Sequence, residues 1–215
     1  MKTLRKTAVL ALLAAASIAG MAAETADLSV KGVIRPAACQ ITLGHDGTVD
    51  YGTISATTLN QSAPTVLGDR TLPLTISCDA ATTFGVIIPD GRPGTVADGM
   101  ETALNSQNLH GLGAVGGRSL GAFTLMFSAP TVDGATGITL ESPNGTTWRE
   151  YDGGVTPGLR YMTAWGVSGA TTPSAIKDLT TDIRVRTGVA AKDDLPDISS
   201  GVALDGLVTI ELRYL

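Results

Sequence analysis

The chain has 215 residues, with 15 basic and 20 acidic side chains and a net charge of −5. This balance argues against the broad basic surface with which proteins bind nucleic acids or anionic membrane surfaces. Glycine is abundant, at 26 residues, and no apolar pattern of helical period runs for three turns beyond residue 22, which disfavours a helical fold.

The first 22 residues have the pattern of a secretory signal peptide. Three basic residues precede an apolar run, Ala8 to Ala19. The small residues Gly20 and Ala22 occupy the −3 and −1 positions of a cleavage site before Ala23. Because the run is too short to span a bilayer, we expect export without direct membrane insertion. Cleavage would remove no acidic residue and would leave 12 basic against 20 acidic residues, a net charge of −8.

An extended segment is expected at the start of the mature chain, over residues 23–32. Leu28, Val30 and Ile34 alternate along it, with Gly32 on the same face. The folded domain is then expected to comprise residues 33–215.

The cysteines, Cys39 and Cys78, are the only two in the chain. In an exported protein such a pair predicts one disulfide. It would close a loop of about 40 residues and contribute roughly 4 kcal/mol on the chain-entropy model. A redox or metal-binding pair is the alternative, but the spacing is not CxxC and no histidines lie nearby to complete a metal set.

Short alternating runs separated by turn signals such as Asp90-Gly91 and Asn144-Gly145 recur along the chain. They predict one all-β sandwich with long loops, one at 90–118 with a helical turn near Ala97 to Leu104, and another at Ala190 to Gly201. The runs are Leu72–Cys78, Phe84–Ile88, Gly121–Phe127, Leu159–Thr163, Leu179–Val185 and 208–214.

The last run is the most regular. Val208, Ile210, Leu212 and Tyr214 share one face of the predicted strand, and polar residues occupy the other. A strand this regular at a chain end, where most domains fray, must be paired. The pattern leaves open whether it completes its own sheet or pairs with another chain.

Few residues suggest catalysis. Gly111–Gly116 matches the GxGxxG dinucleotide fingerprint, but the sequence predicts neither the preceding strand nor the following helix that the motif needs. The histidines, His45 and His110, are expected to be solvated loop residues, and no GxSxG elbow or triad accompanies them. We therefore expect no enzyme, cofactor or metal site. Three further carboxylates, Asp193, Asp194 and Asp197, lack the full ligand spacing of a calcium-binding loop, and a solvated acidic loop is the simpler interpretation.

Several features together resemble the pilin subunits of chaperone–usher fimbriae. Val30–Cys39 is similar to the segment entering the first pilin strand, and Leu72–Cys78 to the second strand, which carries the partner cysteine. The penultimate Tyr214 completes the resemblance. Within that superfamily, Asp50–Ile54 and Asp90–Gly94 most resemble a poorly characterised branch of fimbrial-type exported proteins.

The resemblance implies an immunoglobulin-like sandwich that lacks its last strand. A periplasmic chaperone would fill the gap, and the N-terminal extension of a neighbouring subunit would replace it at the outer-membrane usher. Leu28 and Val30 would be donor side chains, with Gly32 at a close backbone approach. The groove-edge strand that pairs with the chaperone would carry Val208, Ile210, Leu212 and Tyr214.

Three functions follow as hypotheses. The first is a structural fimbrial subunit at the cell surface, contributing to adhesion or biofilm. The second is a self-complete secreted sandwich that binds a surface ligand such as a carbohydrate. The third, a secreted hydrolase, is disfavoured by the scarcity of histidine. The ten-residue extension is shorter than the family's usual one, which suggests a weaker donor strand.

Overall fold

The computed structural model describes residue 26, residues 28–32 and residues 38–215. The chain separates into two units, Met1–Arg35 and Pro36–Leu215. The predicted signal peptide, its cleavage site and Ile34 lie outside the described residues. In the first unit, residues 28–32 have no regular secondary structure, and Leu28 and Val30 are 91% and 90% exposed. No helix among the described residues combines the length and apolarity needed to cross a bilayer.

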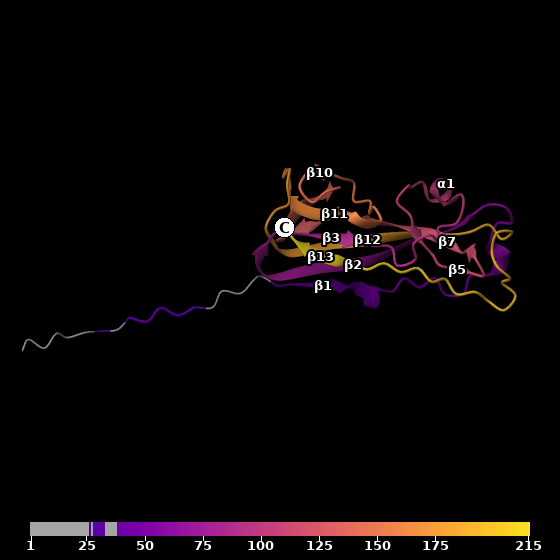
Figure 1. Cartoon of the computed structure of the whole chain (residues 1–215), viewed down its shortest axis with the longest axis horizontal. Coiled ribbons are helices and arrows are strands. Elements are labelled where there is room, and N and C mark those ends of the chain that lie inside the picture. Colours follow the sequence, from indigo (N-terminus) through magenta and orange to yellow (C-terminus); the bar gives the residue numbers. More distant parts are fainter. Residues whose placement is uncertain (1–25, 27, 33–37) are drawn as a thin grey trace, which may run out of the picture. The chain divides into compact units, whose positions relative to one another are not determined.

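Two antiparallel sheets form the second unit, which confirms the predicted all-β sandwich (Figure 1). The first sheet contains β1 (Cys39–Leu43), β2 (Thr65–Thr82), β12 (Ile176–Val189), β7 (Gly121–Phe127), β4 (His110–Gly111) and β8 (Thr131–Val132). The second contains β13 (Glu211–Tyr214), β3 (Phe84–Ile88), β11 (Gly158–Val167), β9 (Ala135–Ser142) and β10 (Arg149–Glu150). The remaining elements are α1 (Met100–Leu104), the hairpin β5 (Ala114–Val115) and β6 (Arg118–Ser119), and the 3-10 turns η1 (Gly44–Gly47) and η2 (Ala56–Thr58).

Alternation along the long strands places their apolar residues in the core. In β2 the side chains from Leu72 to Cys78 alternate between buried and exposed, as predicted. In β12 the same pattern runs from Leu179 to Val185. The register sets Ile76 opposite Leu179, so apolar residues of neighbouring strands meet on one face.

Aromatic residues from both sheets meet at the centre of the core. Trp165 of β11 is fully buried, with its ring centroid 6.1 Å from that of Phe84 in the same sheet and 5.3 Å from that of Phe127 in the other. Such tilted and edge-on contacts are the favoured arrangements of aromatic rings. Trp165 therefore joins the two sheets.

The strands form a continuous path that does not close. The β8–β9 hairpin leads from the first sheet to the second, so the hydrogen-bonded path runs from β1 through to β13. Each of these terminal strands is paired along one edge, β1 to β2 and β13 to β3. Among residues 38–215, no ladder or isolated bridge joins β1 to β13. The fold is therefore an open sandwich with its free edges at these two strands.

The C-terminal strand is shorter than predicted. Regular pairing covers Glu211–Tyr214, and Val208 forms only an isolated bridge with Asp90. The partner strand reaches Pro89 just after Ile88, and proline has no N–H with which to continue a ladder. The upstream residues still run alongside β3, as the hydrogen bond from the Thr209 N–H to the Pro89 carbonyl shows.

The segment 90–118 has more structure than the predicted loop. It contains α1, at the position of the expected helical turn, and the short strands β4, β5 and β6. Ala190 to Gly201 is a loop without strands, as expected. Contrary to prediction, a two-residue strand, β4, ends at the first glycine of the GxGxxG sequence, but the rest of the sequence enters the β5–β6 hairpin where a nucleotide site needs a helix.

The interpretation of His110 as a solvated loop residue is wrong. Its side chain is fully buried in β4, directly opposite Phe123 of β7. The two rings stack with centroids 5.2 Å apart. Leu109 and Leu112 beside it are also buried, but nothing in this glycine-rich stretch alternates as a buried strand does, so the burial of His110 follows from the pairing of β4 with β7.

Candidate functional site

An apolar groove of about 1280 Å³ lies between the two free edges of the sandwich. One wall consists of β1 and the segment that follows it, to Leu59, and the other consists of residues 201–210, which lead into β13. Figure 1 shows this second wall as the yellow chain that runs along the sandwich into β13.

The first wall consists of half-buried apolar side chains. Ile41 and Leu43 of β1 point inward and pack against the main core, as does Val49 beyond η1. The intervening Gln40 and Thr42 are exposed. A β-strand at the closed edge of a sandwich would bury its inward side chains completely, so the partial exposure of these three marks an incomplete edge.

The second wall repeats the pattern. Leu204, Val208 and Ile210, and Leu212 of the adjoining β13, pack against the same core and are only partly buried. Val208, Ile210 and Leu212 belong to the alternating face that the sequence predicted, and Tyr214 is its last member. The tyrosine itself is 53% exposed.

The floor of the groove is the core itself. Phe123, Leu125 and Val185 line it, and each is less than a tenth exposed. At Gly206 the second wall approaches this floor closely: a Cβ there would lie 2.8 Å from Cε1 of Phe123. No larger residue fits at position 206 without displacing the ring or the wall.

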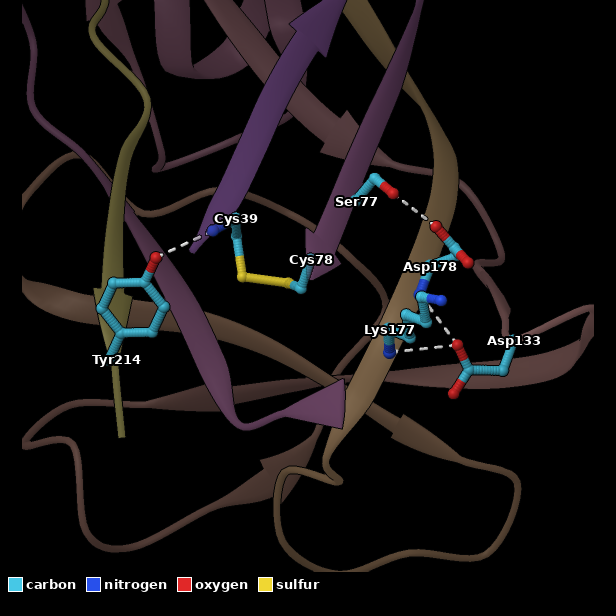
Figure 2. The surroundings of a disulfide bond; sticks show 7 residues. All are labelled: Cys39, Ser77, Cys78, Asp133, Lys177, Asp178 and Tyr214. Carbon is cyan, nitrogen blue, oxygen red and sulfur yellow. Dashed lines mark hydrogen bonds between the residues drawn. A yellow bond between two sulfur atoms is a disulfide. The ribbon is translucent and has the colours of Figure 1, made fainter. Parts of the chain in front are cut away.

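A hydrogen bond and a disulfide hold the end of the groove at the C-terminus. Figure 2 shows the Tyr214 side chain reaching from β13 towards the first residue of β1, where its hydroxyl accepts a hydrogen bond from the Cys39 N–H at 2.9 Å. Cys39 is disulfide-bonded to Cys78 of β2, which confirms the predicted pairing. The two walls are therefore tied together at this end.

An ion pair fixes the second wall to the rest of the sandwich. The Arg92 guanidinium donates two hydrogen bonds to the Asp205 carboxylate, at 2.8 and 2.7 Å. These bonds lower the pKa of Asp205 and raise that of Arg92. Asp90 accepts from the N–H groups of Arg92 and Gly111, so the turn that carries Arg92 is itself held in place.

The opposite side of the sandwich is closed. There the chain from Tyr151 to Val155 crosses between the sheets: the Tyr151 N–H donates to the Thr139 carbonyl of β9, and the Val155 N–H to the Leu125 carbonyl of β7. Gly153 accepts from the Phe127 N–H. The two sides of the sandwich therefore differ: backbone hydrogen bonds connect the sheets on one side, and the groove separates their edges on the other.

The residues predicted for the C-terminal strand lie along one side of the groove, and the predicted donor residues do not. Val208 and Ile210 lie in the second wall and Leu212 follows in β13. The predicted donor residues Leu28, Val30 and Gly32 lie in the separate first unit, where both large side chains are exposed. The first wall was not predicted, although the alternation of Ile41 and Leu43 in β1 was a usable signal for it. The Arg92–Asp205 pair had no local signal, because its members are 113 residues apart.

Comparison with known proteins gives similarity without an assigned activity. A family described as "Protein of unknown function (DUF1120)" matches residues 28–127, from the extension to the end of β7. Two proteins of Escherichia coli (strain K12) are similar over nearly their whole length. One, named "Uncharacterized protein YhcF", is 24% identical over 95% of this chain and 98% of its own. The other, named "Protein GltF", is 27% identical over 100% of this chain and 98% of its own.

Proposed function

We propose that this chain is an exported structural subunit of a chaperone–usher fimbria, assembled by exchange of β-strands between chains. The observation that carries the proposal is the apolar groove between two unpaired strand edges, β1 and β13. An extended segment placed there would complete the sandwich by hydrogen bonding to the free edges and by covering the exposed part of the core.

The energetics favour occupation of the groove. Each aliphatic side chain that an inserted strand buries would contribute about 1.5–3 kcal/mol, and the half-buried Ile41, Leu43 and Ile210 would gain further burial. An open edge beside apolar side chains is also an aggregation hazard. In the proposed pathway a periplasmic chaperone covers the edge first, and a neighbouring subunit replaces it at the outer-membrane usher.

The disulfide and the resemblance of Val30–Cys39 and Leu72–Cys78 to pilin segments support the same compartment and assembly. A disulfide is most stable in an oxidising environment such as the periplasm. The signal-peptide pattern in residues 1–22 provides the route of export. The proposed location is accordingly the periplasm in transit and then the fimbria at the cell surface, where the subunit would contribute to adhesion or biofilm.

The decisive experiment compares two single substitutions in the second wall. Ile210→Asp places a charge in the groove, and Thr209→Asp places the same charge on the neighbouring exposed position. Each is expressed for export with and without a candidate fimbrial chaperone. We expect Ile210→Asp to abolish co-purification with the chaperone and periplasmic accumulation, and Thr209→Asp to leave both intact.

Measurement of the unmodified chain distinguishes the main alternative. Size exclusion with light scattering should show a one-to-one complex with the chaperone and aggregation without it. A stable lone monomer, with Ile210→Asp accumulating as the parent does, would refute strand exchange and favour a self-complete sandwich that binds a surface ligand.

A further inference from the structure

The second wall of the groove is attached to two neighbouring segments, the turn after β3 and the residues that continue from β4. The Gly91 N–H of the turn donates a hydrogen bond to the Leu207 carbonyl at 2.8 Å. Beyond β4, the Leu112 carbonyl accepts one from the Asp205 N–H at 3.1 Å. The ion pair between Arg92 and Asp205 is a third connection. The position of the wall therefore depends on how these two segments are held.

The Asp90 carboxylate joins the two segments to each other. One of its oxygens accepts a hydrogen bond from the Arg92 N–H at 2.8 Å, and the other accepts one from the Gly111 N–H at 2.9 Å. The packing here is tight, because a Cβ at Gly111 would overlap the Arg92 carbonyl oxygen. His110 directly precedes Gly111 in the chain, so its imidazole lies at the junction that holds the wall.

The His110 ring also contacts the floor of the groove on which the wall packs. It stacks on Phe123 with the ring centroids 5.2 Å apart and the ring planes at 22°. Phe123 in turn meets the wall at Gly206, where a Cβ would lie 2.8 Å from Cε1 of the ring. A displacement of the imidazole would therefore reach the wall by two routes, through Phe123 and through the Asp90 junction.

The surroundings of His110 favour the neutral imidazole. The side chain is fully buried, and neither ring nitrogen has a well-formed hydrogen bond to any residue that the structure describes. Burial lowers the pKa of His110, and the opposing effects of the Asp90 carboxylate and of the backbone carbonyls of Phe123 and Ile88 are smaller. A proton on the ring is therefore costly while the wall is closed.

The charges around the junction leave one counter-ion for a protonated His110. The neighbouring strands β3 and β7 carry no titratable side chain. The turn and the second wall contribute Arg92 and Asp205, which are paired with each other. Asp90 is therefore the carboxylate that would attract the imidazolium, and that attraction would compete with the hydrogen bonds by which Asp90 holds the junction.

We propose that His110 is a pH-sensitive latch for the second wall of the groove. The neutral ring keeps residues 204–208 packed on the floor, and protonation releases them while the two sheets stay folded. Protonation favours the released state because there the imidazolium reaches water and Asp90. An occupant held between the walls would consequently exchange faster in acid than at neutral pH. The latch belongs to the groove itself and does not require the occupant to be a fimbrial strand.

Hydrogen exchange of the mature chain, Ala23–Leu215, measures the opening of the wall. Mass spectrometry follows fragments that cover residues 201–209, and compares them with fragments from the β2–β12 ladder, between pH 7.5 and 5.0. The rates are corrected for the pH dependence of exchange in unstructured peptides. Parent and variants are compared in the same form, alone where the chain is monomeric and otherwise with its bound chaperone.

Three variants accompany the parent. His110→Leu and His110→Gln are both neutral replacements, and either one that folds is sufficient for the comparison. His45→Gln is the matched control, because His45 is the other histidine of the chain and is exposed in η1.

We expect the wall to exchange faster than the ladder at every pH, as a local opening does. In the parent and in His45→Gln, protection of the wall should fall about 30-fold from pH 7.5 to 5.0. This factor corresponds to the ordinary pKa of 6.5 in the released state and a ring that stays neutral in the closed state. In the His110 variants the change should stay within about twofold, because no proton is taken up at this position.

Two results would overturn the inference. If the wall is as protected as the ladder at every pH, it opens only when the whole domain unfolds. If the protection of the wall does not change with pH in the parent, or falls equally in the His110 variants, His110 does not control the wall. Neither result bears on strand exchange, which the experiment with the chaperone tests separately.

Discussion

Removing the disulfide should destabilise the sandwich strongly, because it closes a long loop and anchors a wall of the groove. Cys39 and Cys78 are 39 residues apart and directly opposite each other in the β1–β2 ladder. The chain-entropy model assigns a loop of this length about 4 kcal/mol. For the double variant Cys39→Ala, Cys78→Ala we therefore expect the free energy of unfolding to fall by about 4 kcal/mol.

Urea denaturation followed by tryptophan fluorescence provides the assay. Trp165 is fully buried and reports on the core, and Trp148→Phe removes the second tryptophan. With a urea dependence of about 2 kcal/mol per molar, the midpoint should fall by roughly 2 M. The oxidised parent treated with a reductant is the matched control, because it keeps both sulfur atoms.

The comparison distinguishes two contributions of the disulfide to stability, the loop-closure entropy of the unfolded chain and the packing of the sulfur atoms in the folded one. If the reduced parent and the alanine variant both unfold within about 0.5 M of the oxidised parent, with unchanged urea dependence, the reasoning from loop closure is refuted. If only the alanine variant is destabilised, the loss comes from packing around the sulfur atoms and not from the cross-link.

Three further predictions concern single side chains. Tyr214→Phe removes the hydrogen bond to the Cys39 N–H and should cost about 1 kcal/mol in the same urea assay. Arg149→Ala leaves the buried Glu141 carboxylate, among the described side chains, with the Thr156 hydroxyl alone and should cost about 1–3 kcal/mol; an unchanged midpoint would contradict this. Burial lowers the pKa of His110 from its ordinary value of 6.5. Just below pH 6.5, His110 is therefore protonated in the unfolded chain and still neutral in the folded chain. Stability should therefore fall as pH drops below 6.5, and His110→Leu should lack that slope between pH 7 and 5.

Patterns that depend on neighbouring residues were readable from the sequence. The alternation in Leu72–Cys78 and Leu179–Val185 predicted strands with the correct buried faces. The two cysteines predicted the disulfide. The run at 208–214 correctly placed three inward side chains, although Pro89 on the partner strand shortened the ladder in a way that the run itself could not indicate.

Long-range partners decided the rest. His110 lies in a short glycine-rich stretch without strand alternation, and its ring stacks against Phe123 of another strand. The Arg92–Asp205 pair joins residues that only the fold brings together. No local signal could identify either, because the energetic gain in each case comes from a contact distant in sequence.

By itself the sequence determined an antiparallel β-sandwich, its inward-facing residues and one cross-link, since these follow from side-chain alternation and residue identity. Tertiary structure alone decided that β1 and β13 each keep one unpaired edge and that a groove lies between these edges, while residues 151–155 close the opposite side. The physical reason is that pairing of strand edges depends on which strands are neighbours in space. Alternation is identical in a strand with two partners and in a strand with one.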